Sequence, residues 1–316
     1  MKSNSWSNLK RARGFLLGAG CAVLAAQALA QAPETGPASA TPPPGDSAVK
    51  AAMVQNPCPP PLPMPAALVG LIDALLKPGH PEPLDAAALN QPEVKEYRRI
   101  MDQRNANDWP QLCQYHAANA ALKQPPRVVF MGDSITEYWL RGDPQLFSDE
   151  VLDRGISGQT TQQMLLRFYD DVIALRPQTV HIMAGTNDVA GNTGPTSPAN
   201  FQHNIMAMVE LARAHHIRVV IGSIPPAAEF FWQPAIRPAA TIVALNTWLK
   251  SYCAQQHIRY VDYYPLLADA QGGLKSGYSN DGVHPDKDGY AQMRALALRA
   301  IATPVATPVA ATGAAP

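Results

Sequence analysis

The chain has 316 residues, with 25 Lys and Arg against 25 Asp and Glu, and a formal net charge of zero when the histidines are neutral. This balance, without a basic cluster beyond the first residues, argues against nucleic acid or an anionic membrane surface as a partner. About 250 residues follow the predicted leader and linker, which is enough for one well-buried domain.

Residues 1–30 are predicted to be a signal peptide. Four basic side chains precede an apolar run that is too short to span a membrane, and Ala28-Leu29-Ala30 matches the small-x-small cleavage pattern. Cleavage there leaves 21 of the 25 basic residues against 25 acidic ones, and a periplasmic or secreted protein. Cys21 leaves a second possibility, a lipoprotein, but Gly18 stands where a lipoprotein signal carries a larger aliphatic residue.

The mature chain divides into four predicted parts. Residues 31–65 are dominated by Pro, Ala, Gly, Thr and Ser, a composition that favours an extended, disordered linker. The tail over 303–316 has the same character. Between them we expect a helical N-terminal extension over 66–124, where apolar residues recur at helix spacing, and one main domain over 125–302. The last predicted helix of the extension runs from about residue 110 to 122.

The main domain is predicted to alternate strands with helices. Short apolar runs predict strands at 127–131, 151–155, 178–184, 217–223 and 258–262. Longer segments predict helices at 159–175, 198–216, 237–256 and 286–301. This alternation implies right-handed crossovers and a parallel sheet that helices cover on both faces.

Three cysteines remain after export, and an oxidising compartment permits one disulfide among them. Cys253 falls on the apolar side of a predicted helix, where a reduced cysteine packs as a small hydrophobic residue. A Cys58–Cys113 bridge is therefore favoured by elimination. Three free thiols remain the alternative, because spacing alone does not establish a bridge.

Two stretches carry residue types suited to nucleophilic catalysis. The run from Gly132 to Thr136, Gly-Asp-Ser-Ile-Thr, follows a buried strand, and ligands in open α/β sheets bind beyond the carboxyl ends of strands. Asp281 stands three residues before His284, so it can hold Nδ1–H of the imidazole and leave Nε2 to take a proton from a serine hydroxyl. Each stretch alone could instead be a turn or a helix cap.

Two further stretches close predicted strands. The run Arg154-Gly-Ile-Ser-Gly-Gln-Thr-Thr161 contains Gly158, and glycines let a backbone approach a ligand closely. The run Ala184-Gly-Thr-Asn-Asp188 offers the side-chain amide of Asn187. Its alternative role is that of an ordinary turn residue.

In this order, the four stretches resemble those of the SGNH (GDSL-type) hydrolase superfamily. The resemblance implies that Ser134 is the nucleophile, His284 the general base and Asp281 its orienting acid. It also implies an oxyanion hole formed by the backbone N–H groups of Ser134 and Gly158 and by the Asn187 amide. The implied fold is a flavodoxin-like three-layer α/β/α sandwich with a five-stranded parallel sheet in the order 2-1-3-4-5.

Other residues are candidates for substrate contact. We predict Asp133, Arg154 and Trp232 as substrate-binding residues, with two alternatives left open. Arg154 could equally brace the site or pair with a surface acid. The proline-rich loop over 224–241, which carries Trp232, could wall the pocket or supply ordinary core packing. No His, Cys and carboxylate cluster has metal-ligand spacing, so we expect neither a metal nor an organic cofactor.

The sequence thus predicts an exported serine esterase that hydrolyses short-chain carboxylic esters through an acyl-serine intermediate. Acetylated glycans or other small esters are the candidate substrates, on the argument of compartment alone. One alternative is an O-acyltransferase that passes the same acyl group to a glycan hydroxyl. Another is a non-catalytic glycan-binding module on the same fold, against which the four intact stretches argue, since binding needs no activated serine.

Overall fold

The computed structural model describes residues 54, 56–79 and 87–302. The predicted signal peptide, the predicted tail, and residues 31–53 and 55 of the predicted linker lie outside these described residues. Within the described ranges, no helix combines the length and the apolar character that crossing a membrane requires.

Five parallel strands form one sheet in the order β2-β1-β3-β4-β5. The strands are β1 (Val128–Gly132), β2 (Val151–Gly155), β3 (Thr179–Met183), β4 (Arg218–Gly222) and β5 (Arg259–Val261). Each lies within one residue of its predicted bounds, and the predicted strand order is confirmed. β1 lies between β2 and β3, and its last residue, Gly132, pairs with Gly155 of β2 and Met183 of β3.

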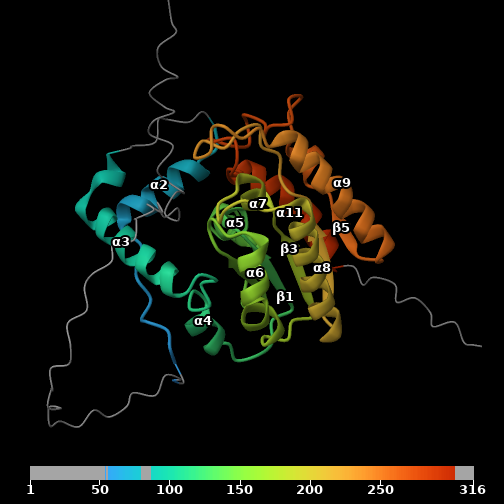
Figure 1. Cartoon of the computed structure of the whole chain (residues 1–316), viewed down its shortest axis with the longest axis horizontal. Helices are drawn as coiled ribbons and strands as arrows, with labels where there is room; N and C mark the ends of the chain where they lie inside the picture. Colours follow the sequence, from blue (N-terminus) through green and yellow to red (C-terminus); the bar gives the residue numbers. More distant parts are fainter. Residues whose placement is uncertain (1–53, 55, 80–86, 303–316) are drawn as a thin grey trace, which may run out of the picture.

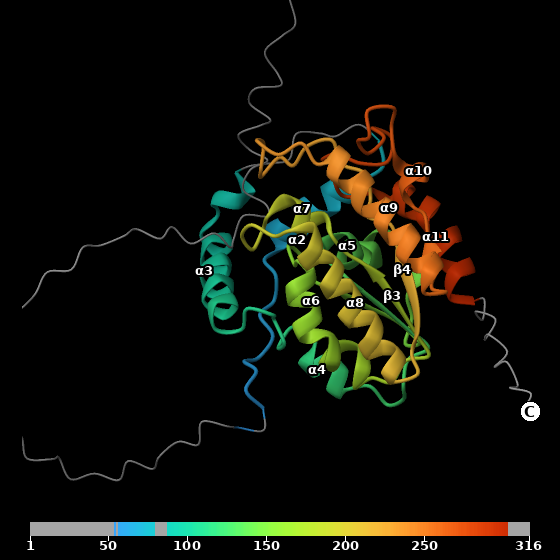
Figure 2. The ribbon, with the colours of Figure 1, turned by 45° about the vertical axis from the view of Figure 1, so that its right-hand side comes forward.

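Helices cover both faces of the sheet, which confirms the three-layer sandwich (Figure 1, Figure 2). One face packs against α6 (Thr161–Phe168), α8 (Pro198–Ala214) and α9 (Ala239–Gln255). The other packs against α5 (Ser134–Gly142) and α11 (Lys287–Ala302). Successive strand residues therefore feed two separate cores, as the strand period of two requires: Val129 and Met131 point to the first, Val128 and Phe130 to the second.

Several elements differ from their predicted form. The predicted helix over 159–175 is α6 followed by a single π-helical segment, η3 (Tyr169–Ile173). Three short helices and one turn were not among the predicted elements: α5, α7 (Thr186–Ala190), α10 (Tyr264–Leu267) and the 3-10 turn η2 (Pro144–Leu146). Two of them, α5 and α7, begin inside the predicted site stretches, so the sequence indicates where these helices begin but not how long they are.

The N-terminal extension lies along one side of the sheet domain (Figure 1). It consists of α2 (Ala66–Leu76), η1 (Ala88–Asn90), α3 (Pro92–Asn107) and α4 (His116–Ala120). Leu76 is fully buried in the core that α5 and α11 share, so α2 is packed onto the main domain. Arg141 of α5 adds a hydrogen-bonded ion pair with Asp73 of α2, with an Nη2 to Oδ2 distance of 2.8 Å.

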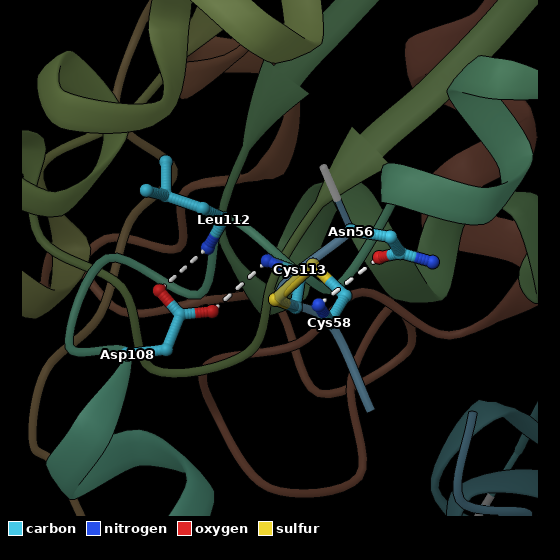
Figure 3. The surroundings of a disulfide bond; sticks show 5 residues. All are labelled: Asn56, Cys58, Asp108, Leu112 and Cys113. Atoms are coloured by element: carbon cyan, nitrogen blue, oxygen red, sulfur yellow. Dashed lines mark hydrogen bonds between the residues drawn. A yellow bond between two sulfur atoms is a disulfide. The ribbon is translucent and has the colours of Figure 1, made fainter. Parts of the chain in front are cut away.

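A disulfide joins Cys58 to Cys113, and Cys253 is a buried free thiol. Residues 56–65, which fall in the predicted linker, contain neither helix nor strand, and the disulfide ties them to the extension. Figure 3 shows that the carboxylate of Asp108 accepts the backbone N–H groups of Leu112 and Cys113, both at 2.9 Å. This loop stands where a helix over 110–122 is expected, and leaves only α4 of that helix.

Candidate active site

Ser134 lies at the junction of β1 and α5. Asp133 is the N-cap of α5 and accepts the Ile135 backbone N–H at 2.9 Å, so the cap and the serine hydroxyl are separate groups. Before it, the chain passes between two neighbours at Gly132, where an added Cβ would lie 2.0 Å from the Thr136 hydroxyl oxygen and 2.8 Å from the Met183 carbonyl oxygen. Only glycine fits there.

Ser134, His284 and Asp281 form one hydrogen-bonded series. The Ser134 hydroxyl oxygen lies 2.8 Å from Nε2 of His284, and Nδ1 of the same ring lies 2.7 Å from Oδ2 of Asp281. The second carboxylate oxygen of Asp281 accepts the backbone N–H groups of Val283 at 2.9 Å and His284 at 2.8 Å. The loop therefore folds around the carboxylate, which fixes both the position of the ring and the nitrogen that carries its proton.

Burial and charge shift the pKa values of His284 and Asp281 in opposite directions. The side chains of His284 and Asp281 are only 1% and 2% exposed. Burial lowers the pKa of His284, but the charge and hydrogen bond of Asp281 outweigh it and raise that pKa above its usual value. Burial likewise raises the pKa of Asp281, but the His284 charge and the loop hydrogen bonds bring it below its usual value. Asp281 is therefore ionised wherever His284 titrates.

The structure also brings Gly158 and Asn187 to the serine. Gly158 has a φ of +79°, a backbone conformation that glycine adopts readily and most other residues do not. Asn187, in the first turn of α7, donates its side-chain Nδ2 to Asp133 Oδ2 at 3.2 Å and to the Gln159 carbonyl at 3.0 Å. Its amide thus bridges the residue before Ser134 and the residue after Gly158.

A buried arginine, not predicted from the sequence, joins two of these stretches. Arg167 of α6 donates to the Gly132 carbonyl at 2.9 Å and also to the side chain of Gln159, and it pairs with Asp171 at 2.9 Å. The side chains of Arg167 and Asp171 are 0% and 1% exposed. One signal was available, since Arg167 stands between Met164 and Phe168 on the apolar face of the helix.

Glu137 holds the loop before Gly158. Its carboxylate accepts the backbone N–H of Ser157 at 2.7 Å and also the Ser157 hydroxyl. Glu137 belongs to the first turn of α5, directly after the serine. No sequence pattern pairs residues 137 and 157, because only the fold places α5 beside the end of β2.

Of the predicted substrate-binding residues, Asp133 and Arg154 are buried inside the protein. Burial raises the pKa of Asp133 to about 7. Arg154 donates its Nε to Asn119 at 2.9 Å, and its guanidinium lies 4.7 Å from the centre of the Tyr115 ring. These contacts join Arg154 to the N-terminal extension, which favours the bracing alternative for this residue.

Trp232, the third predicted substrate-binding residue, is half-buried near Asn187, one of the predicted oxyanion-hole donors. Its indole N–H donates to Asn192 at 2.8 Å, and Asn192 in turn donates to Asn187 at 2.6 Å. The neighbouring ring of Phe230 is fully buried and belongs to the core. The loop over 224–241 therefore combines the two alternatives, since one aromatic ring packs in the core and the next reaches toward the site.

No group of three His, Cys, Asp or Glu side chains that could hold a metal ion occurs among the residues that the structure describes. His181, inside β3, is fully buried, stacks on Phe130 with ring centres 4.5 Å apart, and lies 3.0 Å from the Tyr263 hydroxyl. It is a core residue, as its place in an apolar strand predicts.

The fold and the site together define a class of protein. A parallel sheet that helices cover on both faces, with a serine, a histidine and an aspartate hydrogen bonded in series at the carboxyl end of β1, is the architecture of an acyl hydrolase. The sequence profile of the GDSL-like Lipase/Acylhydrolase family matches residues 130–292. The chain belongs to this family and is an ester hydrolase.

Solved structures of family members resemble the chain over its main domain. A GDSL-like lipase from Bacteroides thetaiotaomicron is 45% identical, with a TM-score of 0.59, over 61% of this chain and 97% of that one. A proposed acylhydrolase from Bacteroides fragilis is 44% identical, with a TM-score of 0.60, over 61% of this chain and 96% of that one.

A curated relative matches over a shorter stretch. The uncharacterized lipoprotein YqeF of Bacillus subtilis (strain 168) is 36% identical over 83 residues, which is 25% of this chain and 34% of that protein. The matching part of the chain therefore spans about a third of the length of this relative.

Proposed function

We propose that the protein is an exported serine esterase that hydrolyses small carboxylic esters through an acyl-Ser134 intermediate. The observation that carries the proposal is the unbroken hydrogen-bonded series from Ser134 through His284 to Asp281. A serine hydroxyl is a weak nucleophile until an adjacent base takes its proton, and this series supplies that base in the required orientation.

The proposed reaction has two half-reactions. The Ser134 oxygen attacks the acyl carbon while Nε2 of His284 takes the hydroxyl proton; the tetrahedral intermediate collapses, and His284 gives that proton to the departing alcohol. His284 then takes a proton from water, whose oxygen attacks the acyl carbon. The second intermediate collapses to the free acid, and the proton returns to the Ser134 oxygen.

The negative charge that develops on the carbonyl oxygen needs donors. In the proposal these are the backbone N–H groups of Ser134 and Gly158 and the Asn187 amide. One such donor contributes about 10²–10³ in rate in a studied protease. Both acceptors of the Asn187 amide lie inside the protein, and the 3.2 Å bond to Asp133 is the longer, so an oxyanion would compete with that bond first.

Three observations support the proposed location, the size of the acyl group and the type of reaction. The predicted signal peptide and the lipoprotein relative support a place outside the cytoplasm. Trp232 beside the oxyanion candidates supports a walled pocket and therefore a small acyl group. Membership in an acylhydrolase family favours an enzyme over a glycan-binding module, while an O-acyltransferase would use the same acyl-enzyme and differ only in the acceptor.

The test uses the purified mature protein with a panel of aryl esters and a fluorophosphonate label. We expect Ser134→Ala and His284→Ala each to lose nearly all hydrolysis, since members of such a triad act as a unit and cost about 10⁶ in a studied protease. Ser134→Ala should also lose the label. The matched control is Ser251→Ala on the exposed side of α9, which should keep both.

Near-normal turnover by folded Ser134→Ala would overturn the proposal. A second measurement separates hydrolase from transferase: the yield of free acid is compared with the yield of a new ester when a sugar or simple alcohol is added. Dominant transfer at low alcohol concentration would assign the protein to the acyltransferases.

A further inference from the structure

Asn192 lies at the end of a turn that returns the chain to the active site. Gly191 ends α7 in the left-handed conformation, with a φ of +67°. The backbone N–H of Asn192 then donates to the carbonyl of Asn187 at 3.1 Å. The side chains of these two asparagines are thereby placed face to face, five residues apart in the sequence.

The side-chain amide of Asn192 contacts three parts of the site. Its Nδ2 donates to Oδ1 of Asn187 at 2.6 Å and lies 3.5 Å from the carbonyl oxygen of Gly158. Its Oδ1 accepts the indole N–H of Trp232 at 2.8 Å. One half-buried side chain therefore joins both oxyanion candidates to the loop over 224–241.

The hydrogen bonds from Trp232 through Asn192 to Asn187 and Asp133 can run in only one direction, which the first and last residues set. The indole N–H of Trp232 can only donate, so Asn192 must turn its oxygen toward Trp232 and its NH₂ group toward Asn187. Asn187 must then present its oxygen to Asn192. The NH₂ group of Asn187 is left facing Asp133, whose carboxylate accepts from it.

The alternative orientation of the Asn187 amide is penalised. A rotation by half a turn would set its NH₂ group against the NH₂ group of Asn192 and its oxygen against Asp133 and the Gln159 carbonyl. Buried polar groups left unpaired in this way are costly. Without Asn192, only the contacts on the NH₂ side of Asn187 would oppose that rotation.

We propose that Asn192, oriented by Trp232, is a positioning residue that keeps the NH₂ group of Asn187 directed at the oxyanion. The inference rests on the proposed function, in which Asn187 is an oxyanion donor. Asn192 acts through Asn187 and does not touch the reacting atoms. Trp232 is itself held by the rings of Phe230 and Phe231, whose centres each lie 4.9 Å from its own, so the series starts from a packed aromatic cluster.

The test is a double-mutant cycle on kcat with a short-chain aryl ester. Asn187→Ala is expected to lower kcat by about 10²–10³. Asn192→Ala is expected to lower kcat by about tenfold, part of that oxyanion effect, with little change in KM. In the Asn187→Ala background the same substitution should have no further effect, because the group it positions is gone.

Two subtler variants test the direction of the series. Asn192→Asp keeps the acceptor for Trp232 and removes the donor to Asn187, so it should lower kcat as Asn192→Ala does. Trp232→Phe keeps a ring and removes only the indole N–H, and a kcat loss of about threefold to tenfold is expected, within the oxyanion effect. Gln162→Ala is the control, since its amide bonds to Thr196 in the adjacent loop and to neither asparagine.

The outcomes separate the two proposals. Full activity of Ser134→Ala would overturn the proposed function and this inference together. Inactive Ser134→Ala with unchanged kcat in folded Asn192→Ala and Asn192→Asp would overturn the positioning role alone. Losses that are additive in the double mutant, or confined to KM, would also overturn it. Because Asn192→Ala could fail to fold, thermal unfolding is measured for each variant, and Trp232→Phe then provides the decisive kcat.

Discussion

We expect the pH dependence of activity to follow the ionisation of His284, which is buried beside Asp281. The proposed base works only when neutral, and the Asp281 carboxylate outweighs burial to raise its pKa above the usual 6.5. We therefore expect kcat/KM to rise with pH through a midpoint above 6.5. Asp281→Asn should move this midpoint down and lower the rate by about 10⁴, as the equivalent change does in a studied protease. A pH–rate profile of both proteins measures this.

Asp133 also titrates in this range, because burial raises its pKa to about 7. The control is Asp133→Asn, since asparagine caps a helix as well as aspartate does. A midpoint that persists in folded Asp133→Asn and moves down in Asp281→Asn belongs to His284. Its disappearance would assign the pH dependence to Asp133 and contradict the prediction.

The raised pKa of His284 also makes stability depend on pH, and stability changes in the direction opposite to activity. The pKa of His284 is higher in the folded protein than in the unfolded chain, so its contribution to the free energy of unfolding is fully present below pH 6.5 and is lost as pH rises through the folded pKa. The enzyme thus gains activity in the pH window in which this contribution to stability falls. Denaturant unfolding on either side of the window detects the change.

At the scale of single residues, the sequence motifs predicted the candidate catalytic residues. They did not predict the buried residues that hold those candidates in place. Asp281 and His284 lie three residues apart, so a local pattern is enough to pair them. Arg167 and Glu137 act on partners 35 and 20 residues away, and only the folded sheet sets those pairs. Asn192 stands within a polar turn, where an asparagine is ordinary.

At the scale of elements, the loop over 224–241 sets an expectation for acyl-chain length. Phe230 is fully buried, and Trp232 is fixed to Asn192 and packed between two rings, while Pro225, Pro226, Pro234 and Pro238 restrict the backbone. A stiff aromatic wall accommodates a small acyl group and excludes a long one by steric clash.

We therefore expect kcat/KM to fall steadily from acetyl or butyryl to decanoyl esters of one aryl alcohol. Initial rates below the micellar range provide the measurement. Trp232→Ala, which opens the wall, should flatten this series relative to the wild type. Rates that rise through decanoyl in the wild-type protein would contradict a small pocket.

Local polar contacts explain why some elements departed from their predicted form. The expected helix over 110–122 is interrupted because Asp108 takes the N–H groups of Leu112 and Cys113 and Gln111 adopts a φ of +58°. A side chain that competes for backbone N–H groups in this way leaves no trace in hydrophobic periodicity. By contrast, β1 and β3 were predicted within one residue because both are short, largely apolar runs that are buried along their whole length.

At the scale of the whole molecule, the N-terminal extension contacts both sides of the site. The side-chain amide of Asn280, next to Asp281, donates to the carbonyls of Leu75 at 2.8 Å and Lys77 at 2.7 Å, at the end of α2. On the other side, Gln159, next to Gly158, donates its side-chain amide to the Pro110 carbonyl at 2.9 Å.

These contacts predict different effects for two shortened proteins. A protein that lacks residues 31–55 should keep its activity, because it retains Cys58 and the partners of Asn280 and Gln159 in the extension. A protein that begins at residue 125 should lose most of its activity and unfold at a lower temperature, because the partners of Asn280 and Gln159 are gone. Equal kcat/KM and equal melting temperatures for the protein from residue 125 and the mature chain would contradict the prediction.

The bond between Asn280 and α2 has a consequence for local unfolding. Proteins open locally in roughly contiguous cooperative units. Asn280 donates to the end of α2, and the next residue, Asp281, accepts the backbone N–H groups of Val283 and His284, so the two sets of hydrogen bonds meet at adjacent residues. The family profile matches from residue 130 onward, yet the helix to which this loop is bonded ends more than fifty residues earlier, so we expect the catalytic loop to open together with a helix outside the matched residues.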